Sequence, residues 1–135
     1  MNFTKVKQSL KLHEGKRNLP YQDSLGVWTV GYGHNMEVPL SDRAIEQILE
    51  DDLHSAVSEL DRAFPSWKQH SENRQDVLVE MIFNLGAPRL SSFKNMWKAL
   101  DDKDYPQASA EMLDSKWASQ VGQRAETLAM AMLDG

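Results

Sequence analysis

The sequence predicts a single α+β domain that is mainly helical, with a small N-terminal β-sheet lobe, a long connecting helix and a C-terminal helical lobe. Two observations support this class. A glycine-rich segment, residues 16–34, interrupts the helical pattern near the N-terminus, and apolar residues then recur at helical spacing almost to the C-terminus. The length of 135 residues suits one compact domain. We expect the sheet lobe over about 14–60, and a helical lobe over about 61–135 that also includes helix 3–14.

The first helix is predicted over residues 3–14, where apolar side chains recur at helical spacing. Gly15 follows at the position where helices commonly end in a left-handed residue. Pro20 and the later glycines break helical structure. The run VWTVGY, residues 27–32, is β-branched and aromatic, so we expect a strand there, after a turn at residues 23–26. This strand belongs to a small, irregular sheet or hairpin.

A long helix is predicted from Ser41, its expected N-cap, to the residue before Pro65. Its apolar residues form one stripe, namely Ile45, Ile48, Leu49, Leu53, Ala56, Val57, Leu60 and Phe64. The next helix begins after Ser71 and ends at Gly86, and it is apolar on nearly all sides, which indicates a buried central element. Three shorter helices are expected at about 90–100, from Pro106 to about Asp114, and at about 119–133.

The composition excludes several classes of function. A formal net charge of −5 argues against nucleic-acid binding by phosphate neutralisation. The chain has no cysteine, and its histidines show no metal-ligand spacing, so we expect neither a metal nor any other cofactor. No segment is apolar for long enough to span a membrane and the N-terminus does not read as a signal peptide, so no stable membrane insertion is expected.

Glu14 and Asp23 are the first candidates for chemistry. Glu14 falls in the last turn of the predicted helix, where the negative end of the helix dipole favours the protonated carboxyl that a general acid needs. Asp23 falls on a polar turn, which suits a charged carboxylate. Two carboxyls in contrasting environments are typical of glycoside hydrolysis. The spacing alone also fits two ordinary surface residues, so both interpretations remain open at this point.

The segment LHEGKRNLPYQDSLGVWTVGYGH, residues 12–34, resembles the catalytic segment of phage-type lysozymes, the endolysins typified by the lysozyme of T-even bacteriophages. The shared pattern is Glu-Gly, then an Asp nine positions after that Glu, then an aromatic residue followed by T-x-G-x-G-H. The resemblance continues through LSDRAIEQILEDDL, LVEMIFNLG and SKWASQVGQRA, so it covers nearly the whole chain.

The resemblance implies a lysozyme-like fold and a muramidase. Such an enzyme hydrolyses the β-1,4 bond between N-acetylmuramic acid and N-acetylglucosamine in bacterial peptidoglycan, with inversion at the anomeric carbon. By motif position, Glu14 resembles the general acid, and Asp23 resembles the carboxylate that stabilises positive charge or activates water. Thr29 resembles the residue that positions the attacking water. Phe83 and Asn84 resemble substrate-binding positions in the cleft, although the apolar pattern fits Phe83 equally well as a core residue.

Three supporting residues also follow from the resemblance. We predict an ion pair between His34 and Asp52, since an unpaired carboxylate on an apolar helix face would be costly to bury. In the alternative, Asp52 points to solvent beside Asp51. Arg124 matches an arginine that lies against the catalytic glutamate, where it would orient Glu14, and its alternative is an ordinary surface position.

The resemblance further implies a biological setting and two competing functions. A phage lysozyme acts on peptidoglycan as a monomer, stays in the host cytoplasm until it is released to the periplasm and cell wall, and depends on a separate holin for that release. The same fold would also suit a non-catalytic glycan-binding module, but all three catalytic positions are intact. A lytic transglycosylase needs a catalytic glutamate and no second carboxylate, so Asp23 together with Thr29 argues against it.

Two departures from the best-known family members carry expectations of their own. Only residues 35–40 separate His34 from Ser41, so we expect a smaller sheet and a lower wall on one side of the substrate cleft. The acidic net charge gives no long-range attraction to an anionic cell wall. Local positive charge from Lys16, Arg17 and Arg124 is one way to compensate.

Overall fold

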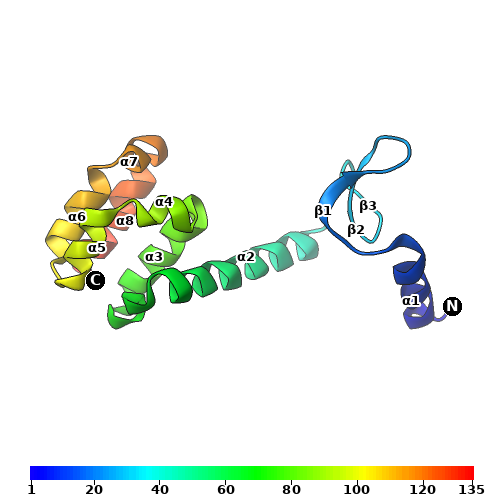
Figure 1. Ribbon diagram of the computed structural model, residues 1–135, viewed down its shortest axis with the longest axis horizontal. Helices are drawn as coiled ribbons and strands as arrows, with labels where there is room; N and C mark the ends of the chain where they lie inside the picture. Colours follow the sequence, from blue (N-terminus) through cyan, green and yellow to red (C-terminus); the bar gives the residue numbers. More distant parts are fainter. The chain divides into compact units, whose positions relative to one another are not determined.

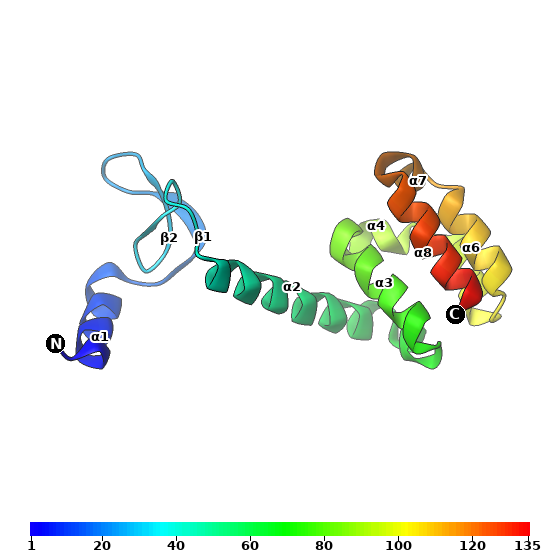
Figure 2. The ribbon, with the colours of Figure 1, turned by 180° about the vertical axis from the view of Figure 1, so that it is seen from behind.

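A computed structural model describes all 135 residues, and the chain divides into two compact units, Met1–Gln47 and Ile48–Gly135. The structure is mainly helical and carries one small antiparallel sheet near the N-terminus (Figures 1 and 2). The predicted α+β class is therefore confirmed. The boundary between the units falls within helix α2 (Asp42–Ala63).

The first unit contains helix α1 (Phe3–Glu14), which begins and ends as the sequence predicts. The Oδ1 atom of its N-cap, Asn2, accepts a hydrogen bond of 3.0 Å from the backbone N–H of Lys5. The helix stops at Gly15, whose φ of +73° lies in the left-handed region that glycine adopts without strain. This ending places Glu14 in the final turn of the helix.

The sheet has the order β1-β2-β3, with β1 (Arg17–Gln22), β2 (Trp28–Gly31) and β3 (His34–Asn35). Tyr21 of β1 lies opposite Thr29 of β2, and an irregularity follows Arg17. Strand β1 is at the edge of the sheet, where Pro20 is tolerated because a proline has no N–H to contribute to a ladder. The chain therefore reverses after β1, at residues 23–27, and again between β2 and β3.

Helix α2 confirms the predicted N-cap, because the Oγ atom of Ser41 accepts a 3.1 Å hydrogen bond from the N–H of Ala44. The apolar stripe of this helix behaves differently along its length. Ala56 and Leu60 are buried, whereas the earlier members are at least 40% exposed, namely Ile45, Ile48, Leu49 and Leu53. Within its unit, the apolar stripe of α2 therefore contributes to the hydrophobic core only near the C-terminal end of the helix.

The second unit is helical. Its elements after α2 are η1 (Pro65–Gln69), α3 (Glu72–Leu85), α4 (Ala87–Ser91), α5 (Lys94–Asp101), α6 (Tyr105–Leu113), α7 (Lys116–Val121) and α8 (Gln123–Asp134). Helix α8 packs against α6, α3 and α7, and Figure 2 shows α8 running alongside α6. Helix α3 is a central element as predicted, since its buried residues are Val77, Leu78, Met81, Ile82 and Leu85.

Two of the predicted helices are wrong in their extent. The segment 90–100 contains the end of α4 and most of α5, because Ser92 and Phe93 interrupt the helix. Pro88 lies in the first turn of α4, two residues after the N-cap Gly86, and favours the start of a separate short helix. The segment 119–133 likewise divides into α7 and α8 at Gly122, whose φ of +59° and ψ of −123° break the helical hydrogen bonding.

The hydrophobic core lies in the second unit. Its fully buried large side chains include Leu60, Leu78, Met81, Leu90, Met96, Leu100, Met112 and Met132. None of the helices combines the length and the apolar character needed to cross a membrane.

Candidate active site

Glu14 lies against the turn between β2 and β3. A Cβ atom built on Gly33 in that turn would lie 2.9 Å from the Oε2 atom of Glu14 and 3.2 Å from its carboxyl carbon. The space above Gly33 is therefore filled by the Glu14 carboxyl group. Gly33 has a φ of +78°, so the turn itself also favours glycine.

Asp23 begins the turn that joins β1 to β2, and the backbone of that turn holds its side chain. The Oδ1 atom accepts hydrogen bonds from the N–H groups of Leu25, at 2.8 Å, and Val27, at 2.9 Å. Two donors on one oxygen fix the orientation of the carboxylate through an Asx-type turn. The second oxygen, Oδ2, remains available to another partner.

Thr29 is buried, with 5% of the residue exposed, in the strand that follows this turn. Its hydroxyl donates a 2.9 Å hydrogen bond to the carbonyl oxygen of Val27. The same carbonyl accepts the N–H of Asp23 at 2.9 Å. Since the Thr29 hydrogen is already donated, its oxygen is left as an acceptor. The peptide groups of Val27 thus hold both the carboxylate of Asp23 and the hydroxyl of Thr29.

His34 lies in β3, opposite Val30 of β2. Its Nε2 atom is buried and has no hydrogen-bond partner, a costly state for a polar atom. Asp52 is an exposed residue of α2 and belongs to the second unit. The ion pair between these two residues would join the two units and stays a prediction.

Three other expected site residues lie in the second unit. Phe83 is 42% exposed and is not part of the core cluster, so the structure does not use it as a core residue of this unit. The Oδ1 atom of Asn84 accepts a 2.8 Å hydrogen bond from the indole N–H of the buried Trp117. Arg124 lies 3.7 Å from the carboxylate of Glu80. Its expected contact with Glu14 stays a prediction.

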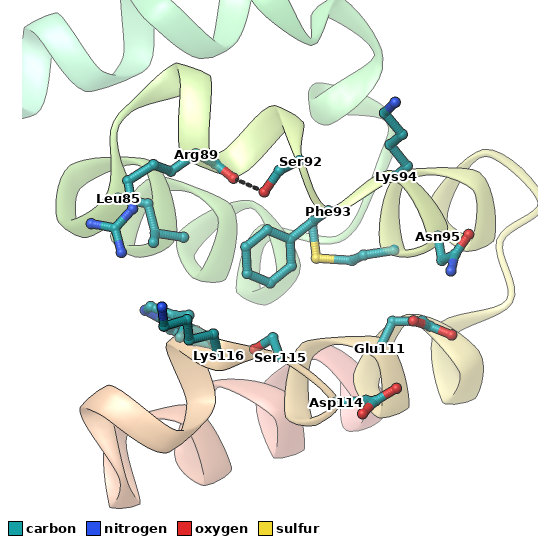
Figure 3. Close-up of a pocket in the computed structure, with 12 residues that line it drawn as sticks. Leu85, Arg89, Ser92, Phe93, Lys94, Asn95, Glu111, Asp114, Ser115 and Lys116 are labelled. Atoms are coloured by element: carbon teal, nitrogen blue, oxygen red, sulfur yellow. Dashed lines mark hydrogen bonds between the residues drawn. The ribbon is translucent and has the colours of Figure 1, made fainter.

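Each unit contains a cavity. The first unit has an apolar groove of about 500 Å³ along α1, and Glu14, Tyr32 and Gly33 line it. The second unit has a cavity of about 600 Å³, and none of the site residues predicted from the sequence lies on its wall. Figure 3 shows Arg89 and Lys116 at one end of it and Glu111 and Asp114 at the other. No cluster of three or more histidine, aspartate or glutamate side chains is arranged to hold a metal ion.

Sequence reasoning did not assign Val27 and Gly33 any part in the site. Val27 acts through its peptide N–H and C=O, which no side-chain pattern reveals. Gly33 does carry a signal, because it is a conspicuous member of the run GYGH, but glycines in such runs usually serve only the backbone. Their importance becomes visible only when the turns are in place.

A carboxyl at the end of a helix and a second carboxylate on the β1–β2 turn of a small sheet are the pair of acidic groups that a glycoside hydrolase uses. Comparison with known proteins agrees with this class. The model of the Phage lysozyme family matches residues 11–130, so the chain belongs to that family. It is a lysozyme, with the lytic muramidase function of the family.

Three relatives are distant in sequence but match the chain over most of their length. The chain is 24% identical to "Probable T4-type lysozyme 2" of Dictyostelium discoideum, over 88% of each protein. It is 28% identical to an endolysin of Acyrthosiphon pisum secondary endosymbiont phage 1, over 81% of this chain and 74% of that protein. It is 30% identical to the endolysin of Salmonella phage P22, over 76% of this chain and 73% of that protein.

Proposed function

We propose that this lysozyme hydrolyses the β-1,4 bond between N-acetylmuramic acid and N-acetylglucosamine with inversion, through Glu14, Asp23 and Thr29. The observation that carries the proposal is the shared anchoring of Asp23 and Thr29 on the peptide groups of Val27. A carboxylate and a hydroxyl acceptor held by one residue form a rigid two-point site for a water molecule. Preorganised groups of this kind lower the barrier because they are oriented before the substrate binds.

On the leaving-group side, Glu14 donates its proton to the glycosidic oxygen as the bond to the anomeric carbon breaks. A positioned general acid contributes typically about 10²–10⁴-fold to the rate. The position of Glu14 at the end of α1 and against the glycine turn supports this role.

On the opposite side of the sugar ring, the water attacks the anomeric carbon. Asp23 accepts the proton that the water loses, through the Oδ2 atom that the turn leaves unused. Thr29 accepts a hydrogen bond from the same water and so aligns it. Inverting enzymes place their two carboxyl groups roughly 6.5–9.5 Å apart to leave room for such a water. Phe83 and Asn84 contribute to binding of the glycan, as their family positions suggest.

The direct test is Glu14→Gln, which keeps the shape of the side chain and removes its proton. We expect lysis of outer-membrane-permeabilised Gram-negative cells to fall by about 10²–10⁴-fold, with an unchanged circular dichroism spectrum and melting temperature. Glu37→Gln is a matched control, because it makes the same change at another exposed position in the same unit. Wild-type activity in Glu14→Gln would defeat the proposal.

The products decide between the remaining mechanisms. Hydrolysis adds one water to each muropeptide, whereas a lytic transglycosylase leaves an anhydro-sugar, and mass spectrometry separates the two. The anomer formed first, followed by NMR, shows whether the reaction inverts or retains. Binding to peptidoglycan without any release of product would instead indicate a glycan-binding module.

The proposed biological role is lysis of a bacterial host by a phage-encoded enzyme. We infer that the enzyme acts as a monomer, accumulates in the host cytoplasm, and reaches the periplasm and cell wall when a separate holin permeabilises the membrane. Fractionation of expressing cells with and without a co-expressed holin tests this path, since lysis should require both proteins.

A further inference from the structure

Two glycines in the turn region of the sheet have the same backbone requirement but different surroundings. Gly31 ends β2 with a φ of +69°, and Gly33 precedes β3 with a φ of +78°. Residues with a side chain rarely adopt a positive φ, so an alanine at either position strains the backbone to a similar extent. A Cβ at Gly31 would meet nothing within 4 Å, whereas a Cβ at Gly33 would meet the Glu14 side chain.

The contact at Gly33 involves the functional end of Glu14. The hypothetical Cβ would lie 2.9 Å from Oε2, 3.2 Å from the carboxyl carbon and 3.6 Å from Cγ. The first of these separations is too short for any real Cβ, so one of the two groups must move. The carboxyl is the flexible end of a long side chain at a helix terminus, so it moves more easily than the backbone turn. An added methyl group would therefore displace the carboxyl and leave the turn largely in place.

We propose that Gly33 is a positioning residue for Glu14: its missing side chain leaves the space in which the carboxyl is held at the turn. This inference rests on the proposed role of Glu14 as the general acid. Glutamate has three rotatable side-chain bonds, and here it is anchored only at the end of a helix, so a firm backbone surface limits the directions that its carboxyl takes. Proton donation is sensitive to such limits, since a misplacement of about 1 Å can cost about 10²-fold in rate.

The experiment compares Gly33→Ala with Gly31→Ala on purified peptidoglycan. Both variants should show a similar decrease in melting temperature, because both add a methyl group to a residue with positive φ. In Gly33→Ala we expect kcat to fall by about 10–100-fold with KM changed by less than about twofold. In Gly31→Ala we expect kcat within about threefold of wild type. The basic limb of the pH profile of kcat/KM should move only in Gly33→Ala, because that limb reports the proton donor.

A double-variant cycle keeps the test informative if Gly33→Ala is poorly stable. If Gly33 acts through Glu14, adding Gly33→Ala to Glu14→Gln should produce little further loss of the residual activity at a temperature where both proteins are folded. Equal losses of kcat in the two alanine variants, or an additive loss in the double variant, would overturn the proposal. Wild-type activity in Glu14→Gln would instead overturn the role of Glu14 itself, so the two failures are distinguishable.

Discussion

The two units of the chain differ in what holds them together. All of the buried apolar side chains belong to Ile48–Gly135, whereas Thr29 is the one buried residue of Met1–Gln47. The first unit is organised by hydrogen bonds of turns and strands instead, and the Asp23 turn is the densest group of them. The proposed chemistry is therefore placed on a scaffold of backbone hydrogen bonds, and the hydrophobic stabilisation resides in the helical unit.

This difference teaches where stability and activity should respond to mutation. Core residues of the second unit should affect folding with little direct effect on the reaction, and the residues of the first unit that carry or position the reacting groups should affect the reaction more than folding. Variants in each unit test whether effects on stability and effects on activity are separated in this way.

The largest effect on stability is expected for Leu78→Ala in α3, since this side chain is completely buried. Truncation leaves a cavity in the core, and such changes cost about 2–5 kcal/mol in free energy of unfolding. Urea unfolding followed by circular dichroism measures the change. Leu25→Ala is the matched control, because Leu25 is 87% exposed, and it should alter stability by less than about 0.5 kcal/mol.

The activity of Leu78→Ala tests whether the core of the second unit affects the reaction directly. At a temperature where Leu78→Ala is folded, its kcat on peptidoglycan should stay close to the wild-type value. A large loss of kcat in the folded variant would show that the core of the second unit shapes the site directly, and the separation between the units would fail.

A second, smaller effect is expected from the predicted pair of His34 and Asp52. The buried Nε2 atom of His34 lacks a partner within its own unit, so a carboxylate from α2 would relieve a real cost. A double-mutant cycle with His34→Ala and Asp52→Ala should give a coupling energy of about 0.5–3 kcal/mol. Additive effects would mean that Asp52 points to solvent, and that the two units are not joined through this pair.

The same contrast explains how much of the structure the sequence predicts. The bounds of α1 and the starts of α2 and α3 follow from local signals, namely Gly15 and the capping side chains of Ser41 and Ser71. The two split helices were predicted as single ones because apolar residues continue across the breaks. The interruptions depend on backbone geometry at Ser92 and Phe93 and at Gly122, which the apolar pattern does not record.

The site divides in a similar way. The motif identifies Glu14, Asp23 and Thr29, since their types and spacing are specific. It does not reveal that Val27 holds two of them, or that the carboxyl of the third fills the space above Gly33. The hydrogen bonds of Val27 are local and depend on the folded turn. The contact of Glu14 with Gly33 follows from the pairing of β1 with β2, which sets Arg17 opposite Gly31. The family motif thus predicts the reacting groups, and the structure supplies the backbone that orients them.

The smallest predicted effect is a pH dependence of the helical unit. His70 is buried with 6% exposure, and its Nδ1 atom lies 2.9 Å from the hydroxyl of Tyr105. Burial lowers the pKa of His70, the positive charges of Arg74 and Lys103 lower it further, and Asp101 opposes them. The folded protein therefore binds a proton at His70 less readily than the unfolded chain, in which the pKa of histidine is about 6.5.

The sign of the effect follows from this difference. As the pH falls below about 6.5, the unfolded state takes up more protons than the folded state, so stability decreases until the lowered folded pKa is passed. Urea unfolding at pH 7.5 and pH 5 should show this loss in wild type and a shallower loss in His70→Gln. His54→Gln in α2 removes an exposed histidine and should leave the wild-type slope unchanged. If the unfolding free energy of His70→Gln depends on pH as steeply as that of wild type, groups other than the buried imidazole of His70 cause the acid sensitivity.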